Sequence, residues 1–365
     1  MSSETINGRF QMLQRLGSGG MGEVWRVYDN VLGRDLAIKF VGEQELRDTP
    51  GAEAILRDEA KTAGSLLGQP QVVSVLDLLD VDTASRNGPA LLMEYIDGCT
   101  LQEWMAVYSP KLDQATKNIV GLYIALEVTR AIEAAHRRNI LHRDIKPLNT
   151  LISREGSVKV ADFGLARVVD AITRTHTVWG RQTPLYAAPE QWNDEKPDEA
   201  TDMYQLCATL YHFFAGVPAN EGNSILGLLQ WHQTGSVKPL AERAPSLNGK
   251  VADLITRGLV KDGEGRPAPW NLIDEISGAL MHKINMSVSL DGCTEEQMEK
   301  IAHITTCGLE EMKKSKKLNL GFPDPFEATQ EAIAILFHGG QPLLSFSKPV
   351  RPAPSQPPAQ AGVAK

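Results

Sequence analysis

Apolar and polar residues alternate over short runs in the first third of the chain, which is the pattern of strands with one buried face. Runs of this kind cover residues 10–16, 24–28 and 36–41, and an apolar run at residues 91–96 leads into a polar turn. At residues 118–138 apolar side chains instead recur every three or four positions, which predicts one long core helix. The pattern therefore predicts a β-rich part followed by a helical part.

One helix is expected within the β-rich part. Over residues 52–67 the apolar side chains fall along one side of a helix, and Glu59 lies on that stripe. A carboxylate in such a place needs a cation, and Lys39 in the third strand is the expected partner. Glu53 is the rival for this pairing, although it is less well aligned with the stripe.

A glycine-rich segment joins the first two predicted strands. Residues 17–22 read Gly-Ser-Gly-Gly-Met-Gly. In a dinucleotide-binding fold these glycines would open a helix, but here they are followed by a second strand and then a third. A hairpin that covers phosphate groups is therefore favoured, because glycine has no Cβ to keep main-chain N–H groups away from the ligand.

Two short acidic motifs follow the long helix at a spacing that suits phosphoryl transfer. The first is His-Arg-Asp at residues 142–144, with Lys146 and Asn149 close behind, and the second is Asp-Phe-Gly at residues 162–164. The residues between the two motifs read as a β-hairpin, which would bring Asn149 and Asp162 together. An amide and a carboxylate so placed suit Mg²⁺, which takes oxygen ligands, and Asp144 would face the same site.

The order of these motifs, completed by Ala-Pro-Glu at residues 188–190, resembles that of the bacterial eukaryotic-like serine/threonine protein kinases. The resemblance runs over about residues 10–280. It implies an α+β fold of two lobes, with a small β-rich N-lobe at about residues 10–94 and a larger helical C-lobe at about residues 98–280. Residues 1–9 are then expected to be an N-terminal tail.

The resemblance also implies roles for the residues of the two acidic motifs. Asp144 would be the catalytic base that accepts or orients the substrate hydroxyl proton, and Lys146 would neutralise the migrating phosphoryl group. Asn149 and Asp162 would hold Mg²⁺, with Mn²⁺ as an alternative metal.

Around ATP the resemblance implies that Lys39, paired with Glu59, holds the α- and β-phosphates. The other residues expected at the nucleotide come from the glycine-rich segment, the neighbouring strands and the hinge between the lobes: Leu16, Gly17, Ser18, Gly19, Gly20, Met21, Gly22, Glu23, Val24, Ala37, Met93, Glu94, Ile96 and Leu151.

Further residues match the family's supporting structure. Arg266 corresponds to the arginine that pairs with the glutamate of Ala-Pro-Glu, here Glu190. Asp202 would hold the catalytic loop from behind, although Thr201 or Asp202 could also be only the N-cap of the next helix.

Three threonines in the loop between the second acidic motif and Ala-Pro-Glu are candidate phosphorylation sites, namely Thr173, Thr175 and Thr177. Arg143, beside the catalytic Asp, is typical of kinases whose loop is ordered by phosphorylation, because a phosphate adds about −1.5 to −2 of charge and takes guanidinium partners. We therefore expect autophosphorylation at residues 173–177, with a polar loop that carries no phosphate as the alternative.

Residues 285–345 follow the family-like region and are expected to form a small folded appendage whose role and partner the sequence does not indicate. A strand is predicted from residue 286, a capping box joins Thr294 to Gln297, and a helix opens at Asp324 and reaches Phe337.

Three residues of this appendage invite comparison with zinc sites, namely Cys293, His303 and Cys307. Their spacing is uneven and four ligands are usual at structural zinc, so ordinary core cysteines are favoured. Residues 348–365 are rich in proline and are expected to form a disordered tail.

Composition narrows the function further. The chain has 365 residues and a formal net charge of −8, which argues against bulk binding of nucleic acid. No run of 18 apolar residues occurs, and the first residues lack the basic and apolar segments of a secretion signal. The four cysteines lack the spacing of a disulfide scaffold. These features predict a cytoplasmic protein with reduced thiols and no membrane span.

The sequence thus predicts an ATP-dependent kinase that phosphorylates Ser or Thr of other proteins and of itself, with a homodimer as one route to autophosphorylation in trans. The alternative is a nucleotide-binding scaffold with the kinase fold and little turnover. Such scaffolds typically lose the lysine, the base or the magnesium Asp, and all three are present. A small-molecule phosphotransferase is a weaker alternative, because those enzymes generally lack Ala-Pro-Glu.

Overall fold

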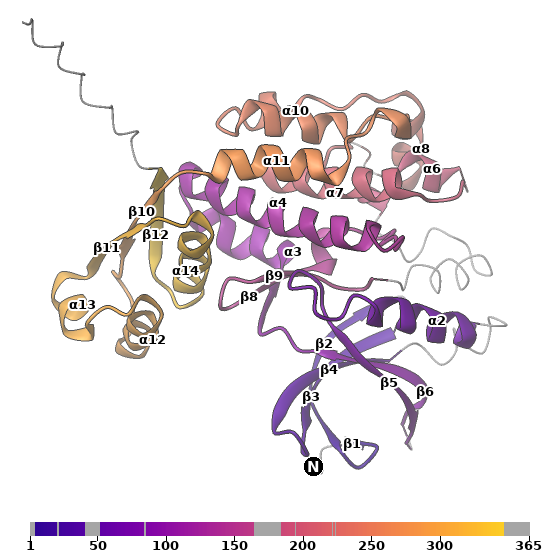
Figure 1. The fold of residues 1–365 in the computed structure, drawn as a ribbon, viewed down its shortest axis with the longest axis horizontal. Helices are drawn as coiled ribbons and strands as arrows, with labels where there is room; N and C mark the ends of the chain where they lie inside the picture. Colours follow the sequence, from indigo (N-terminus) through magenta and orange to yellow (C-terminus); the bar gives the residue numbers. More distant parts are fainter. Residues whose placement is uncertain are drawn as a thin grey trace, which may run out of the picture.

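The computed structural model describes residues 4–19, 22–40, 52–83, 85–163, 184–193, 195–220, 222 and 224–346. These residues form a β-rich N-lobe, a helical C-lobe beside it and a smaller α/β unit that packs against the C-lobe (Figure 1). The predicted two-lobed α+β architecture is therefore confirmed.

The described part of the N-lobe forms an antiparallel sheet with the strand order β1-β2-β3-β4-β6-β5. Its strands are β1 (Thr5–Ile6), β2 (Phe10–Gly19), β3 (Gly22–Asp29), β4 (Arg34–Phe40), β5 (Val75–Asp82) and β6 (Asn87–Glu94). Helix α2 (Ala52–Gly64) packs on this sheet through Leu56 and Ala60. It ends three residues before the predicted residue 67, where the chain turns so that Leu66 is buried and Leu67 is exposed.

The C-lobe is built around α4 (Gln114–His136), most of whose side chains are buried. The helix begins four residues before the predicted residue 118, because the Asp113 carboxylate caps it by accepting the N–H groups of Ala115 and Thr116. The other helices here are α3 (Leu101–Glu103), α6 (Pro189–Trp192), α7 (Glu199–Ala215), α8 (Ile225–Thr234), α9 (Leu240–Arg243), α10 (Gly249–Arg257) and α11 (Pro269–Leu280).

A small sheet lies in the C-lobe next to the N-lobe, with the order β7-β8-β9. Its strands are β7 (Gly98–Thr100), β8 (Thr150–Ser153) and β9 (Val158–Val160). Strands β8 and β9 are the predicted hairpin. At its open end the Ala161 N–H donates to the Asn149 carbonyl at 2.8 Å, so the two acidic motifs are brought side by side.

The appendage is a folded α/β unit. Strand β10 lies between β11 and β12 and is antiparallel to both. The Thr294–Gln297 capping box and the helix that reaches Phe337 are both observed. The elements are β10 (Ile284–Ser289), α12 (Glu295–Thr305), α13 (Leu309–Ser315), β11 (Lys317–Phe322), α14 (Pro325–Phe337) and β12 (Gln341–Phe346).

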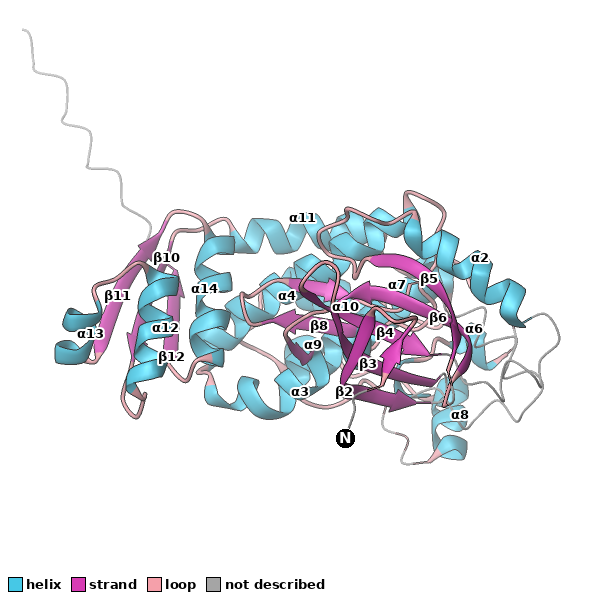
Figure 2. Ribbon diagram, turned by 90° about the horizontal axis from the view of Figure 1, so that it is seen from below, coloured by secondary structure: helices cyan, strands magenta, loops and turns pink. Residues whose placement is uncertain are grey.

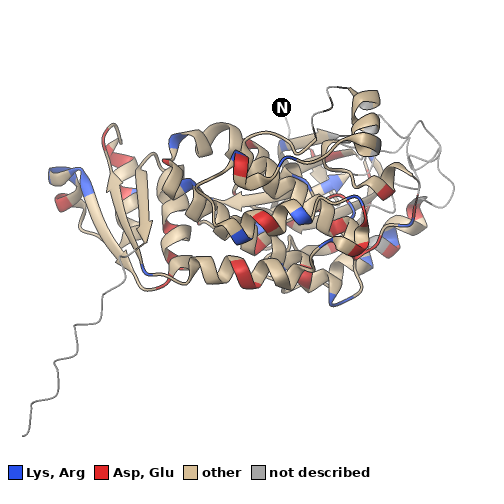
Figure 3. Ribbon diagram, turned by 90° about the horizontal axis from the view of Figure 1, so that it is seen from above, with Lys and Arg blue, Asp and Glu red and all other residues tan. Residues whose placement is uncertain are grey.

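The appendage and the C-lobe share one continuous apolar core, and α14 and β12 both contact α4. Figure 2 shows α14 between the appendage sheet and the helices of the C-lobe. Acidic and basic residues are interspersed over the described helices and strands (Figure 3). In the part of the chain that the structure describes, no helix is long and apolar enough to cross a bilayer.

Candidate active site

The catalytic loop is held by a buried carboxylate on α7. Asp202 is fully buried and accepts hydrogen bonds from the main-chain N–H groups of His142 and Arg143, at 2.8 and 2.7 Å. The ring of His136 lies 2.9 Å from the same carboxylate. The residue that caps α7 is instead Asp198, so the predicted role of Asp202 behind the loop is confirmed and the reading of Thr201 or Asp202 as the N-cap is wrong.

Two glutamines complete the support of this loop. The side chain of Gln205 accepts from Ile145 N–H at 2.9 Å and donates to the Arg143 carbonyl at 2.8 Å. Gln191, at the end of α6, donates to the same carbonyl and accepts from Gln205. Sequence reasoning missed both glutamines. Gln205 follows Asp202 by three residues, so it lies on the same face of α7, and that spacing was the available signal.

His142 fixes the relation between the two acidic motifs. Its Nδ1 accepts from Asp144 N–H at 3.2 Å, so its proton resides on Nε2, which donates to the Ala161 carbonyl at 2.9 Å. The ring also packs edge-on against Phe163, with the ring centroids 4.6 Å apart. His142, two residues before Asp144, is therefore tied to the residues on both sides of Asp162.

The predicted catalytic pair is assembled on this loop. The Lys146 ammonium lies 2.8 Å from an Asp144 carboxylate oxygen, and both side chains are partly exposed. The Asn149 amide donates to the Asp144 carbonyl at 2.8 Å and to its carboxylate at 3.1 Å. Asp144 is thus held in place by two neighbours while one side of it stays open to solvent.

Asp162 faces the same site and meets Lys39 from the N-lobe. The Lys39 ammonium is almost completely buried and lies 2.8 Å from Asp162 Oδ1. Burial alone would raise the pKa of Asp162, but the Lys39 ammonium, through its charge and its hydrogen bond, and the charge of Lys146 lower that pKa below its usual value. The carboxylate is therefore kept ionised.

The main chain is strained at both acidic motifs. Arg143 and Asp162 have φ angles of 65° and 66°, in the left-handed region that few residues other than glycine adopt. Such strain persists only where the surroundings hold it, and it tends to occur at functional sites. Here the hydrogen bond to Asp202 holds Arg143, and the ion pair with Lys39 holds Asp162.

The residues predicted to hold a metal suit a hard cation. Asn149 and Asp162 offer an amide oxygen and an ionised carboxylate, which is the oxygen donor chemistry that Mg²⁺ takes together with substrate phosphates. The 2.8 Å bond between Ala161 N–H and the Asn149 carbonyl places the two residues on adjacent ends of one hairpin. The donor set therefore fits a nucleotide-bound divalent ion.

Five of the residues predicted at the nucleotide lie together between the lobes. Val24, Ala37, Met93, Ile96 and Leu151 belong to one apolar cluster, drawn from three strands of the N-lobe, the hinge and β8. Ligand sites are commonly lined by apolar side chains of this kind.

Leu16, also predicted there, is on β2 outside this cluster and 43% exposed. Gly17, Ser18 and Gly19 end β2, and Gly22 begins β3 with a φ of 117°. Gly20 and Met21 lie outside the described residues.

Two predicted nucleotide residues have side chains that bind other protein groups. Glu23 accepts from Trp25 and Arg86, and its pKa is lowered first by the bond from Trp25. Glu94 accepts from Ser74 N–H and pairs with Lys159 at 2.8 Å. The Lys159–Glu94 pair joins β9 to the hinge strand, and the sequence analysis did not predict it.

The described structure gives Lys39 a partner that the sequence analysis did not name. The expected partner Glu59 lies in α2, but its side chain is outside the described part of the chain. The rival Glu53 instead pairs with Arg57 at 2.8 Å. The preference for Glu59 over Glu53 therefore stays a prediction. The Lys39–Asp162 pair is a separate contact of the same lysine.

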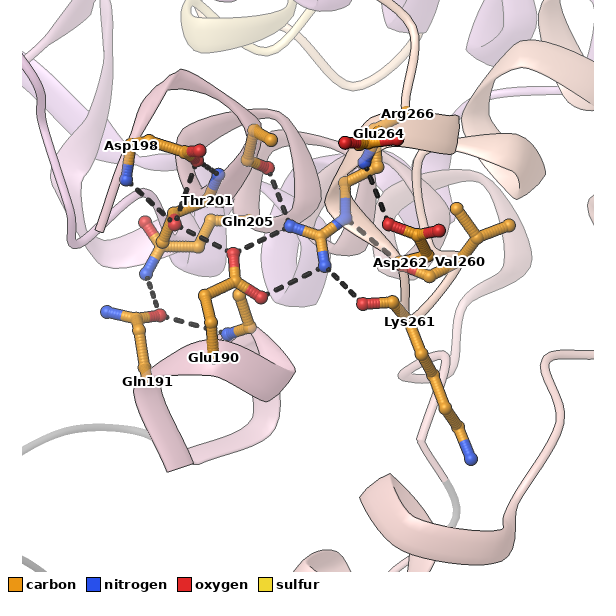
Figure 4. Close-up of polar contacts among 12 residues, drawn as sticks. Glu190, Gln191, Asp198, Thr201, Gln205, Val260, Lys261, Asp262, Glu264 and Arg266 are labelled. Carbon is orange, nitrogen blue, oxygen red and sulfur yellow. Dashed lines mark hydrogen bonds and ion pairs between the residues drawn. The ribbon is translucent and has the colours of Figure 1, made fainter. Parts of the chain in front are cut away.

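At the Ala-Pro-Glu segment, the predicted Glu190–Arg266 pair is observed (Figure 4). Both guanidinium NH groups of Arg266 donate to the Glu190 carboxylate, at 2.7 and 3.0 Å, and the Arg266 side chain is 1% exposed. The same carboxylate accepts from the hydroxyl of Thr201. This cluster fixes the end of the Ala-Pro-Glu segment to α7.

Two other predictions concern ligands elsewhere. Thr173, Thr175 and Thr177 lie outside the described residues. Among the residues that are described, no group of three His, Cys, Asp or Glu side chains is placed to hold a metal ion.

The site brings together an ammonium from one lobe, a carboxylate and an amide on one hairpin, and a second carboxylate beside a lysine. On a two-lobed fold this arrangement suits phosphoryl transfer. A family model for the protein kinase domain matches residues 10–277. The chain therefore belongs to the protein kinase family, whose members use ATP and a divalent metal.

Curated relatives lie among bacterial serine/threonine kinases. The chain is 32% identical over 289 residues to a probable serine/threonine-protein kinase of Streptomyces coelicolor. This alignment covers 79% of this chain and 41% of that protein. It is 31% identical over 265 residues to the serine/threonine-protein kinase PknB of Mycobacterium tuberculosis. This second alignment covers 72% of this chain and 41% of that protein. The chain thus matches about two fifths of the length of these relatives.

Among solved structures, the kinase domain of Mycobacterium tuberculosis PknI resembles this fold with a TM-score of 0.57 and 23% sequence identity. The alignment covers 76% of this chain and 99% of that domain. At this identity the likeness bears on the fold alone.

Proposed function

We propose that this protein is a serine/threonine protein kinase that transfers the γ-phosphoryl group of ATP to Ser or Thr hydroxyls of proteins, with Mg²⁺ as its metal. The observation that carries the proposal is the convergence of Lys39 with Asp162, and of Lys146 with Asp144, on one loop and hairpin. Phosphoryl transfer needs several charges to be positioned at once more than it needs covalent chemistry.

In this mechanism Asp144 accepts the hydrogen bond of the acceptor hydroxyl and orients it for attack. Lys146, already 2.8 Å from Asp144, would lie beside the migrating phosphoryl group and offset its charge. Lys39 would hold the inner phosphates of ATP from the N-lobe. Asn149 and Asp162 would hold the divalent ion, which neutralises charge on the phosphates when it is bound.

The proposed acceptor class rests on the segment that follows the catalytic Asp. Lys146 and Pro147 lead into a single 3₁₀ turn, residues Pro147–Asn149, that ends at the proposed metal ligand Asn149. By family resemblance, a lysine at this place favours Ser and Thr over Tyr. The fixed Ala-Pro-Glu segment favours protein substrates over small alcohols.

The proposal includes autophosphorylation at Thr173, Thr175 or Thr177, and a homodimer as the state in which one copy phosphorylates another. Arg143 next to Asp144 supports the first part, because it is the residue that a loop phosphate would pair with in kinases of this kind. We also propose a cytoplasmic location, since Cys99, Cys207, Cys293 and Cys307 are free thiols and ATP is a cytoplasmic substrate.

Incubation of the purified chain with γ-labelled ATP, Mg²⁺ and a generic basic protein tests the acceptor class. Acid hydrolysis of the labelled proteins should release phosphoserine or phosphothreonine, and the Lys39→Met variant should release neither. Label on tyrosine, or on a small alcohol supplied in the same mixture, would contradict the proposed acceptor. Tight ATP binding without any label would favour the scaffold alternative.

A further inference from the structure

The C-terminal appendage touches the hairpin that carries both proposed metal ligands. Helix α14 lies against the closed end of the β8–β9 hairpin, whose turn is formed by residues 154–156, because Gly156 of the turn approaches the main chain of Gln330 on α14. Figure 1 shows the helix and the hairpin next to each other. The open end of the same hairpin holds Asn149 and Asp162. The appendage is therefore only one short hairpin away from the site.

The contact is made by hydrogen bonds through a buried tyrosine. The hydroxyl of Tyr123, on α4, donates to the Gly156 carbonyl at 3.1 Å and accepts from the Gln330 side-chain amide at 3.0 Å. Tyr123 is 2% exposed, and burial, the largest influence, raises its pKa to about 12. The phenol therefore stays neutral and joins the turn, α4 and α14.

The main chains of the turn and the appendage also meet directly. Gly156 has a φ of +85°, and a Cβ placed on it would come within 2.5 Å of the Gln330 carbonyl oxygen. Only glycine allows this approach. Turn and helix are thus packed at the closest distance that their backbones permit.

Arg154, the first residue of the turn, extends the contact to the hinge. The Arg154 guanidinium lies over the ring of Phe337 on α14, 5.5 Å from its centroid. It also pairs with Asp97 at 3.2 Å, and Arg154 N–H donates to the Asp97 carbonyl at 2.8 Å. Asp97 directly follows the hinge residue Ile96, so the turn is fixed between the hinge and the appendage.

The hairpin is short and rigid enough to transmit this constraint. Strand β8 has four residues and β9 has three, so at about 3.3 Å per residue the turn is little more than 10 Å from the metal ligands. Misplacement of a reacting group by about 1 Å can cost about 10²-fold in rate. A tilt at the turn would therefore displace Asn149 and Asp162.

We propose that the appendage, through Gln330 and Tyr123, is a positioning element that sets the hairpin holding the two metal ligands. This rests on the proposed function only in taking Asn149 and Asp162 as those ligands. It assigns a role to residues 284–346: they fix the active-site hairpin from its closed end. Gln330 and Tyr123 are positioning residues, because neither touches the site itself.

The variants Tyr123→Phe and Gln330→Leu test the proposal with little change in volume. The first removes both hydrogen bonds of the phenol, and the second removes only the bond from α14. The matched control is Tyr211→Phe, because the Tyr211 hydroxyl is also buried in the C-lobe and donates to a main-chain carbonyl, that of Lys238, at 2.9 Å. Thr329→Val controls for change within α14, since that hydroxyl bonds only within its own helix in the described structure.

The first readout needs neither metal nor activity. Hydrogen exchange of the Gly156 and Ala161 amides, which close the turn and the open end of the hairpin, should be at least tenfold faster in Tyr123→Phe than in Tyr211→Phe. Equal exchange at both amides in the two variants would overturn the proposal, because the hairpin would then be set without the appendage.

The second readout is the Mg²⁺ concentration that half-saturates the binding of a non-hydrolysable ATP analogue to the full chain. It should rise several-fold in Tyr123→Phe and Gln330→Leu, and remain at the wild-type value in both controls. A merely stabilising appendage would lower the melting temperature while leaving this Mg²⁺ dependence unchanged, and that result would overturn the proposal. Absence of phosphoryl transfer by the wild-type chain would contradict the proposed function and leave both of these readouts decisive.

Discussion

At the scale of single residues, the site depends on charges that are buried but paired. The Lys39 ammonium and the Asp162 carboxylate meet at 2.8 Å between the lobes. An unpaired charge in such a place would be costly, and the Lys39 ammonium lowers the pKa of Asp162 against the effect of burial. The position of Asp162 in the site therefore depends on its ion pair with Lys39.

The Asp162 carboxyl should make stability depend on acid pH. Burial raises its pKa, but the ammonium groups of Lys39 and Lys146 outweigh burial and hold the pKa in the folded protein below its usual value. Its contribution to the free energy of unfolding is therefore complete above the unfolded pKa of about 3.9 and is lost as the pH falls through the folded pKa.

In Lys39→Met the opposing effect of burial dominates, so the folded pKa of Asp162 rises above its unfolded value and the pH dependence from this group reverses: its contribution to stability is present at low pH and is lost as the pH rises through the folded pKa. Urea unfolding between pH 3 and 6 measures the shift. The double variant Lys39→Met with Asp162→Asn should not show it, and the same acid profile in all three proteins would contradict the assigned pairing.

At the scale of elements, periodicity predicted the strands, the long helix and the hairpin because one face of each element packs on a core. It misplaced ends where a local group decides them: Asp113 starts α4 four residues early, and α2 stops at Gly64. The hairpin that joins Asn149 to Asp162 could be read from spacing, whereas the apolar residues at the nucleotide followed only from the family resemblance. Contacts between elements distant in sequence, such as Lys159 with Glu94 or Gln330 with Tyr123, have no local signal.

The Glu190–Arg266 pair joins the Ala-Pro-Glu segment to the C-lobe, and its loss should destabilise the protein. Because the guanidinium is 1% exposed and bonds twice to the carboxylate, Glu190→Gln should reduce the free energy of unfolding by about 3–5 kcal/mol. Urea denaturation at neutral pH measures this change.

The paired variant Glu190→Gln with Arg266→Met is the control for that prediction. It should lose less stability than the sum of the two single variants, because the second change removes the charge that the first leaves unpaired. Additive losses would mean that the two side chains do not depend on each other.

At the scale of the whole molecule, the lobes, the loop between them and the appendage form one connected support for the site. Lys39 comes from the N-lobe, Asp202 holds the catalytic loop from within the C-lobe, and α14 contacts the hairpin turn. The family match ends at residue 277, but the shared core continues into the appendage. The structural unit around the active site is thus larger than the family domain.

Single-turnover transfer of labelled phosphate from Mg²⁺ and ATP to a protein acceptor, by wild type and by Asp144→Asn, tests the central claim most directly. The account predicts that wild type transfers phosphate and that Asp144→Asn is slower by about 10²- to 10⁴-fold, while the two proteins bind ATP equally well. Equal transfer rates, or no transfer by a wild-type protein that binds ATP, would contradict it.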